Sequence, residues 1–197
     1  EQEALARRRT SLGIPAGRKV VVYLGLLAPY QGTDVLLEAA PHVLQERDDV
    51  HFLIMGFPAV DRYKYIAHQR GLTDHVTFMG KVPYHQARDL LATGDVAVAP
   101  KLSATEGSGK ILNYMATGLP TVAFDTPVSR EYLGEEGIFA QPGDPLSLAQ
   151  ALLAGLSESP EDRRRQGERL RRMAVASFSL DRAAETIFQA YGMVCQP

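Results

Sequence analysis

Cysteine is almost absent from this sequence, and its scarcity excludes several classes of protein. The single thiol, Cys195, cannot form an intrachain disulfide or a metal–thiolate cluster, so we interpret it as an idle thiol near the end of the chain. Five histidines are present, and their spacing matches no metal-binding motif: His42, His51, His68, His75 and His85. We therefore expect no bound metal.

Strong charge and long apolar segments are also lacking. The 197 residues carry a net charge of -2 at pH 7, which gives no general attraction to nucleic acid. No apolar run approaches the about 20 residues that a membrane-spanning helix needs, and no signal peptide is recognisable. A cytoplasmic protein without a nucleic-acid partner is the expectation. Because the chain starts at Glu1 instead of methionine, we interpret it as a processed protein or an excised fragment.

Two common nucleotide-binding motifs are missing. No Gly-x-Gly-x-x-Gly follows the first apolar segment, which argues against a nicotinamide or flavin dinucleotide site. No Gly-x-x-x-x-Gly-Lys-Ser/Thr motif occurs, which argues against a P-loop nucleotidase. Any nucleotide site in this chain must be built differently.

Apolar segments of strand length alternate with helical segments along the whole chain. Six segments read as strands: 20–24, 51–55, 76–79, 95–100, 121–124 and 137–140. Most are continuous apolar runs, typical of parallel strands buried on both faces. The alternation predicts one Rossmann-like α/β/α domain over residues 1–197, with a parallel sheet of about six strands. Loops rich in glycine and proline then meet at the carboxyl edge of the sheet, where such folds bind ligands.

Residues 105–120 form the most distinctive stretch of the sequence. The glycine-rich segment Glu106-Gly107-Ser108-Gly109-Lys110 follows a strand-length run and precedes a helix that Gly118-Leu119-Pro120 ends. The start of a helix has unpaired N–H groups and a partial positive charge, so this layout suits a phosphate. Lys110 and Asn113 lie on one helical face, opposite the apolar stripe. An ordinary capped loop with a solvated lysine is the alternative.

A basic cluster marks the helix expected to begin at Pro160. Its arginines are Arg163, Arg164, Arg165, Arg169, Arg171 and Arg172. Such a cluster can face an anionic membrane or a nucleic acid, whereas Glu161–Arg165 and Glu168–Arg172 pairs at four-residue spacing favour a solvated helix. We expect the solvated helix.

Six short segments occur in an order and spacing that together are specific. They are Gly25 to Asp34, Met55-Gly56-Phe57-Pro58, Val76 to Val82, Gly94-Asp95-Val96, Glu106 to Pro120 and Gln141-Pro142-Gly143-Asp144. This pattern resembles the C-terminal, donor-binding domain of a GT-B glycosyltransferase of family 4, the group 1 retaining transferases. The resemblance runs from near Arg8 to Tyr191.

The resemblance implies how a nucleoside-diphosphate sugar is held. The donor diphosphate lies on the glycine-rich loop and helix start, which here are Gly107, Ser108, Gly109 and Lys110. Glu106 holds the place of the carboxylate that contacts the sugar hydroxyls, so Glu106 and Lys110 are the candidate catalytic residues. No metal or further cofactor is expected, because the helix end and basic side chains carry the leaving-group charge.

The nucleoside contacts also follow from the resemblance. Asn113 stands where the family has a ribose-binding carboxylate, one residue nearer to Glu106 than usual. The backbone after Gly80 contacts the base in the family, which indicates Lys81 and Val82 here. The loops after the first two strands complete the expected donor-binding set with Gly25, Gln31 and Gly56.

Two cations common in the family are missing from this chain. Leu26 and Gln31 stand where an arginine and a lysine usually reach the diphosphate. A hydrogen bond to a charged group contributes about 1.5–3 kcal/mol, so these losses need a replacement. Lys110 is the best candidate, and Lys101 and Lys81 are weaker ones. The donor pocket is thus either rebuilt around Lys110 or partly degenerate.

The leading hypothesis is the donor-binding half of a retaining glycosyltransferase. The resemblance implies an N-terminal acceptor domain that residues 1–197 do not contain, so the chain alone is expected to bind nucleotide weakly and to transfer no sugar. A non-catalytic module that binds a nucleotide or a partner is the alternative, favoured by Leu26, Gln31 and Asn113. A related nucleotide-sugar epimerase is a third reading, which residues 114–120 disfavour. The base, donor sugar, acceptor and any peripheral membrane contact of the full protein are left open.

Overall fold

Six strands form one parallel sheet in the computed structural model, which describes residues 2–194. The strands are β1 (Lys19–Leu24), β2 (Val50–Met55), β3 (Val76–Gly80), β4 (Val96–Ala99), β5 (Thr121–Phe124) and β6 (Ile138–Ala140). Their order is β3-β2-β1-β4-β5-β6, and every neighbouring pair is parallel. The expected Rossmann-like arrangement with six strands is confirmed.

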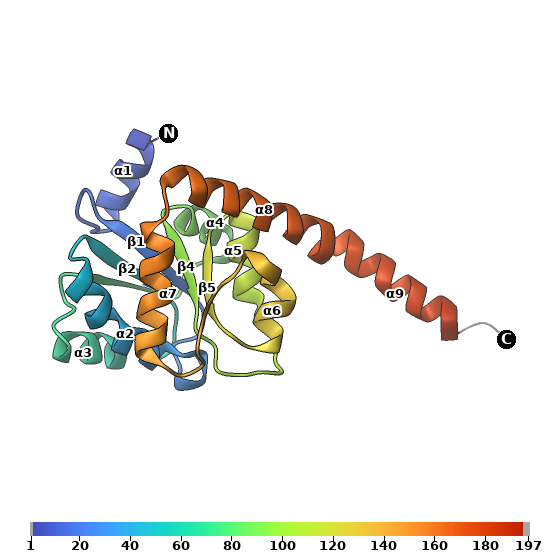
Figure 1. Cartoon of the computed structure of the whole chain (residues 1–197), viewed down its shortest axis with the longest axis horizontal. Coiled ribbons are helices and arrows are strands. Elements are labelled where there is room, and N and C mark those ends of the chain that lie inside the picture. The colour runs from blue at the N-terminus through green and yellow to red at the C-terminus, as the bar shows by residue number, and fades with distance from the viewer. Residues whose placement is uncertain (1, 195–197) are drawn as a thin grey trace.

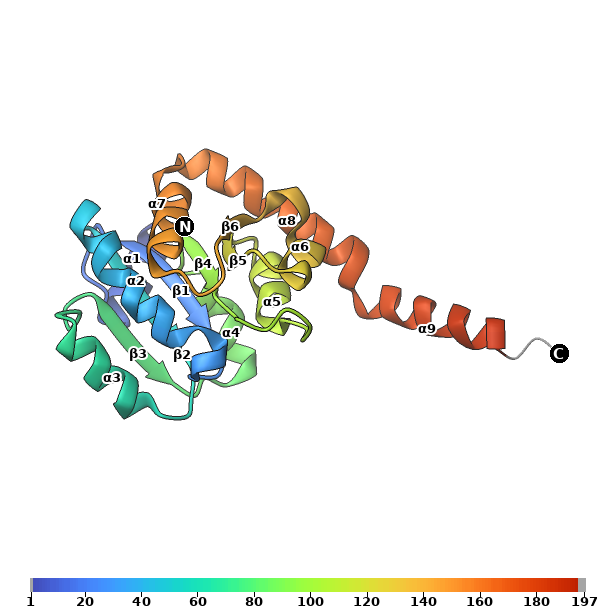
Figure 2. The ribbon, with the colours of Figure 1, turned by 60° about the horizontal axis from the view of Figure 1, so that its bottom comes forward.

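Helices cover both faces of this sheet (Figures 1 and 2). They are α1 (Gln2–Ser11), α2 (Thr33–Glu46), α3 (Val60–Gln69), α4 (Tyr84–Leu91), α5 (Gly109–Thr117), α6 (Pro127–Leu133), α7 (Pro145–Ser157), α8 (Pro160–Phe178) and α9 (Leu180–Val194). Two short 3-10 turns, Pro29–Gln31 and Gly134–Glu136, were not expected from the sequence. Asp144 caps α7 as predicted, by accepting hydrogen bonds from the amides of Leu146 and Ser147.

Two apolar cores lie on opposite faces of the sheet. Tyr23 and Phe52 point to the face covered by α2, α3 and α7. Val22 and Leu53 point to the face covered by α4, α5, α6 and α8. Because both faces are covered, every residue of β2, β4 and β5 is buried, which explains why these strands are continuous apolar runs.

The strand order reverses direction between β1 and β4. β1 pairs with β2 on one side and with β4 on the other, so the chain leaves these two central strands toward opposite ends of the sheet. A crevice forms beyond the carboxyl ends of the strands at such a point, and ligands bind there in open α/β sheets. The loops that follow β1 and β4 are therefore the first place to look for a site.

Glycine brings these two loops into direct backbone contact. Gly32, which ends the turn after β1, has φ +75°, and a Cβ built on it would lie 1.8 Å from the carbonyl oxygen of Pro100. Gly56 after β2 is equally confined, since its Cβ would lie 2.0 Å from the carbonyl oxygen of Gly25. Only glycine fits both positions, and the loops are thereby fixed to one another.

The basic cluster on α8 differs from the prediction. Arg163 is buried, and its guanidinium donates to the carbonyl oxygens of Leu156 and Glu158 and lies 3.7 Å from Asp95. The predicted four-residue pairs are wrong as well. Arg165 pairs with Asp162, and Glu168 pairs with Arg164. Only the outer arginines fit the expected solvated face, because Arg163 is drawn inward by the open carbonyls at the end of α7.

The last helix projects from the body of the molecule. α9 continues from α8 and leaves the sheet and its covering helices behind in both views (Figures 1 and 2). Ser179 caps it by accepting a hydrogen bond from the amide of Arg182, as one of the two predicted caps. Leu180, Ile187, Phe188 and Tyr191 share one helical face and are all exposed. We call these four residues the α9 stripe.

Two further predictions concern membrane-spanning helices and the single cysteine. Within the described residues, no helix is both long and apolar enough to cross a membrane. Cys195, interpreted as an idle thiol, lies outside the described residues.

Candidate functional site

A cavity of about 250 Å³ lies beyond the carboxyl ends of β1 and β4. Its walls come from three segments of the chain: the end of β1 and the loop after it, the loop after β4, and the first turns of α5. The lining residues are Leu24, Gly25, Leu26, Gln31, Lys101, Gly107, Ser108, Gly109, Lys110 and Asn113. The fold therefore brings together seven of the predicted site residues.

The start of α5 carries a buried hydroxyl beside this cavity. Ser108 occupies the N-cap position of a nine-residue helix, yet its side chain makes no capping hydrogen bond. Its Oγ is buried without a hydrogen-bond partner among the described residues, and the residue is 5% exposed. Buried polar groups are nearly always paired, so an unpaired one beside a cavity is a candidate partner for a ligand. The positive end of the helix makes an anion the natural occupant.

Lys110 supplies a positive charge at the start of α5. Its Nζ donates to Oε1 of Gln31 at 2.8 Å and to the hydroxyl of Tyr23 at 3.1 Å, and it lies 4.2 Å from the centre of the Tyr23 ring. The lysine thus reaches from α5 across the end of β1. In the first turn of a helix a cation is disfavoured, and a bound anion would reverse that effect.

The environment lowers the pKa of Lys110 to about 7. Burial of the ammonium is the main cause, and repulsion by the ammonium of Lys101 adds to it. An anion in the cavity would oppose both effects, because it stabilises the charged form. Two ammonium groups around one small cavity are therefore consistent with a site that is completed by an anionic ligand.

Lys101 holds the glycine-rich loop in shape. Its Nζ lies 2.9 Å from a carboxylate oxygen of Glu106 and donates to the carbonyl oxygens of Glu106 and Gly107 at 3.3 and 3.0 Å. These three contacts match the three donors of an ammonium group, and Lys101 is only 8% exposed. Because a trans peptide is planar, turning these carbonyls toward Lys101 turns the amides of Gly107 and Ser108 the opposite way. The charge of Lys101 is thus used within the loop.

Replacing Lys101 with methionine should loosen this loop. The Glu106 amide donates to Oγ of Ser103 at 3.2 Å, and this turn depends on the contacts that the ammonium makes. We expect hydrogen exchange of the Glu106 amide to become about tenfold faster, because local opening no longer breaks those contacts. NMR-detected exchange measures this rate, and Lys64→Met, at an exposed position on α3, is the matched control. An unchanged rate in Lys101→Met would show that the lysine does not hold the loop.

Tyr23 and Tyr114 are site-building residues that the sequence pattern did not reveal. The buried hydroxyl of Tyr114 accepts from the amide of Leu24 at 2.8 Å and donates to the carbonyl of Val98 at 3.2 Å. It therefore attaches α5 to the ends of both β1 and β4. Burial raises the pKa of both tyrosines, so both hydroxyls stay protonated. Tyr23 belongs to the predicted apolar strand 20–24, and Tyr114 was not among the predicted site residues.

Glu106 and Asn113 lie on either side of the α5 start. Glu106 is exposed and pairs with Lys101 in this structure. Asn113 lines the cavity and also a second groove, of about 320 Å³ and mostly apolar, between α4 and α5. The other residues of that groove are Tyr84, His85, Ala87, Arg88, Leu91, Ala116 and Thr117. Asn113 is thus shared by the cavity and the groove.

Four predicted donor contacts do not line the cavity: Gly56, Lys81, Val82 and Glu106. Gly56 lies behind it, and its missing side chain makes room for the backbone of Gly25. Lys81 places its ammonium 5.2 Å from the centre of the Phe57 ring, and Val82 is half-buried against the core beside α4 and α5. Contacts of Lys81 and Val82 with a base remain a prediction.

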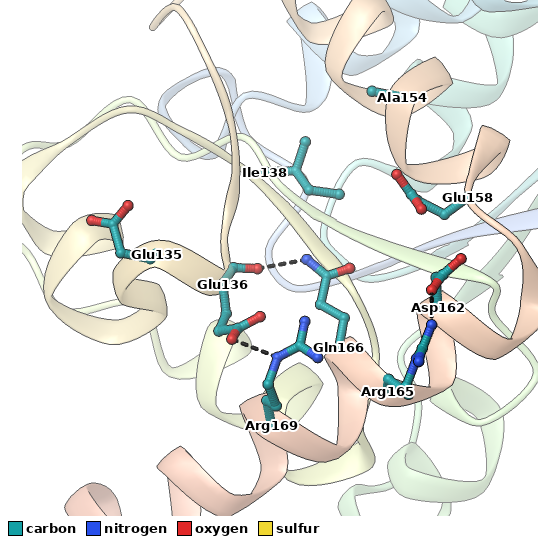
Figure 3. Close-up of a pocket in the computed structure, with 9 residues that line it drawn as sticks. All are labelled: Glu135, Glu136, Ile138, Ala154, Glu158, Asp162, Arg165, Gln166 and Arg169. Atoms are coloured by element: carbon teal, nitrogen blue, oxygen red, sulfur yellow. Dashed lines mark hydrogen bonds and ion pairs between the residues drawn. The ribbon is translucent and has the colours of Figure 1, made fainter.

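A larger hollow of about 480 Å³ lies at the opposite edge of the sheet, where β6 begins (Figure 3). Figure 3 shows Gln166 and Arg169 directed at Glu136, and Arg165 directed at Asp162. These polar side chains are therefore paired with groups of the protein itself. The hollow lies away from the carboxyl ends of the strands, so we do not assign the function to it. In residues 2–194, no group of histidine, cysteine and acidic side chains could hold a metal ion.

Comparison with known proteins gives a consistent result. The family model of the glycosyl transferases group 1 matches residues 18–158. A phosphatidyl-myo-inositol mannosyltransferase of Mycobacterium leprae is 34% identical over 145 residues, which are 72% of this chain and 38% of that protein. Spore coat protein SA of Bacillus subtilis is 30% identical, over 96% of this chain and 52% of that protein. The chain thus spans about half the length, or less, of these relatives.

Solved structures share the fold. A glycosyltransferase from Rickettsia africae superimposes with a TM-score of 0.87 and 17% identity, over 100% of this chain and 53% of that one. Anabaena Alr3699/HepE, in complex with UDP and glucose, superimposes with a TM-score of 0.84 and 18% identity, over 98% of this chain and 53% of that one. These likenesses establish that the architecture is one half of a GT-B glycosyltransferase fold.

Proposed function

The chain belongs to the group 1 glycosyl transferases, and from that premise we propose that it is the donor-binding half of an enzyme that uses a nucleoside-diphosphate sugar. One observation carries the proposal. The cavity joins an ammonium group, the positive end of α5 and the unpaired hydroxyl of Ser108, with glycine backbone between them. This combination suits a diphosphate, which needs several donors and positive charge within a short distance.

The residues around the start of α5 then have distinct roles. The amides of Gly107, Ser108 and Gly109 and the hydroxyl of Ser108 bind the diphosphate. Lys110 donates to it and stabilises the negative charge that develops on the leaving diphosphate as the glycosidic bond breaks. Glu106 holds the donor sugar through its hydroxyls, and Asn113 binds the ribose with its amide. No step requires a metal ion.

The rest of the reaction lies with parts of the protein outside residues 1–197. The relatives are about twice as long as this chain, so we propose that a second domain supplies the acceptor site. Retention of the anomeric configuration follows the family. The 197-residue chain alone is then expected to bind nucleotide and to transfer no sugar.

Titration with nucleotides tests the proposal directly. We expect one of UDP, GDP and ADP to bind by isothermal calorimetry, with UDP the first to try because Anabaena Alr3699/HepE is complexed with it. Lys110→Met should weaken binding by about tenfold or more, since a hydrogen bond to a charged group contributes about 1.5–3 kcal/mol. Lys64→Met keeps the same change of charge at an exposed position and should leave affinity unchanged.

The outcomes separate the two leading functions. Selective binding of one diphosphate that depends on Lys110 supports the donor site. Binding to neither the chain nor the full-length protein would contradict it and would favour a non-catalytic module that binds another partner. Equal losses in Lys110→Met and Lys64→Met would show that the binding depends on net charge alone.

A further inference from the structure

We infer that Gln31 and Tyr23 are positioning residues for Lys110. Residues 31 and 110 then act as a pair, in which the amide oxygen of one holds the ammonium group of the other in the site. The inference rests on the proposed donor function and deepens it. Gln31 was expected to touch the donor itself. Its contacts indicate that it acts through the lysine.

Lys110 reaches its position by crossing the end of β1. The helix that carries it lies on one face of the sheet, and the Tyr23 side chain belongs to the core of the other face. Gly25 makes the crossing feasible. A Cβ on Gly25 would lie 2.8 Å from Nζ and 2.9 Å from Cε of Lys110, so any side chain there would displace the ammonium. The role of Gly25 is therefore to admit the lysine.

Gln31 is held firmly enough to fix the ammonium. It ends the 3-10 turn Pro29–Gln31, and its side chain is almost fully buried. The next residue, Gly32, touches the backbone of Pro100 and cannot move without displacing the loop after β4. Oε1 of Gln31 is thus a preset acceptor, 2.8 Å from Nζ. A neutral acceptor supports the charge without cancelling it, which a carboxylate would do.

The hydroxyl of Tyr23 is also oriented to accept a hydrogen bond from Lys110. Its hydroxyl donates its one proton to the carbonyl oxygen of Leu26 at 2.7 Å. The lone pairs are therefore left to accept from Lys110 at 3.1 Å and from Thr33 at 3.3 Å. The face of the ring adds an attraction for the cation. Two of the three ammonium protons are used by Gln31 and Tyr23, and the third is available for a ligand in the cavity.

This arrangement predicts that donor binding depends on where the ammonium group lies. Whether residue 31 or residue 110 carries that group should not matter. Gln31→Lys places a second ammonium beside Lys110, and Lys110→Gln removes the charge altogether. The double variant Gln31→Lys/Lys110→Gln exchanges the two groups and restores one ammonium facing one amide. We expect Lys110→Gln alone to weaken binding of UDP-glucose by about tenfold or more, and the double variant to return to within about threefold of the parent chain.

The titration of Lys110 gives a second readout that needs no ligand. Its pKa is measured by NMR of the labelled lysine Cε in the 197-residue chain. Gln31→Leu removes the acceptor and should lower this pKa further. Gln31→Glu adds a negative charge and should raise it, while weakening binding of UDP-glucose because the carboxylate repels the diphosphate. A role for Gln31 in packing alone would not move the pKa in opposite directions.

The results distinguish the inference from the function on which it rests. If no nucleotide binds the chain or the full-length protein while the pKa of Lys110 shifts as expected in both Gln31 variants, the donor function fails and the positioning role stands. A pKa that stays the same in both variants overturns the positioning role. A double variant that binds UDP-glucose as weakly as Lys110→Gln alone overturns the exchange.

Discussion

Replacing Gly167 with alanine is expected to destabilise the chain by about 3 kcal/mol, the upper part of the range for overpacked sites. Gly167 lies on α8 where this helix crosses the end of α5. A Cβ on Gly167 would lie 1.9 Å from the carbonyl oxygen of Gly118 and 2.7 Å from its carbonyl carbon. Both atoms are backbone and cannot rotate away, so the helices would have to separate.

Urea unfolding followed by circular dichroism measures this loss as a lower midpoint. Gly109→Ala is the matched control, because a Cβ at that helical glycine meets nothing within 4 Å. Its stability should change by no more than about 0.5–1 kcal/mol, the size of a glycine-to-alanine propensity effect. A loss below 1 kcal/mol in Gly167→Ala would mean that α8 can shift freely over α5.

Donor binding should weaken as the pH rises above neutrality. The pKa of Lys110 is lowered to about 7 in the free chain, so above pH 7 the side chain is increasingly neutral. A diphosphate favours the ammonium, so binding must take up a proton in that range. Affinity for UDP-glucose is then expected to fall by about tenfold per pH unit between pH 7 and the pKa of the complex.

A nucleotide sugar is the right probe for this dependence. Both of its phosphates are esterified, so neither titrates near neutral pH as the terminal phosphate of UDP does. Calorimetry between pH 6 and pH 8.5, in two buffers that differ in ionisation enthalpy, counts the protons taken up. An affinity that is flat across this range, with no proton uptake, would show that Lys110 is already fully charged in the free chain.

The positions of the strands and their burial on both faces were predictable from the sequence, because parallel strands covered on both faces need apolar residues at every position. Thr121-Val122-Ala123-Phe124 has no polar alternation, and it forms the whole of β5 with both faces covered. Helix caps were also readable, as at Asp144. Arg163 shows the limit of such reasoning. Its burial depends on the free carbonyls of α7 and on Asp95, which come close only in the folded chain.

The location of the cavity was predictable from the sequence, and the contacts between the side chains around it were not. Glycine-rich loops after parallel strands must meet at one edge of the sheet, so Gly107 to Lys110 indicated the cavity. The direction of a long side chain is not encoded in sequence spacing. Lys110 was placed correctly on the polar side of α5, yet its partners Gln31 and Tyr23 are brought to it by the crossing over Gly25. Tyr23 looked like any other residue of a buried strand.

The α9 stripe affects how the stability of this chain can be measured. Phe188 is 77% exposed and Leu180 is 88% exposed, so the native chain carries an accessible apolar surface. Fluorescent dyes such as ANS bind such surfaces, and their emission is commonly taken as a sign of partial unfolding. This chain is expected to increase the fluorescence of the dye while it is fully folded. Its melting is therefore followed best by calorimetry or near-ultraviolet circular dichroism, which respond to packing and not to the stripe.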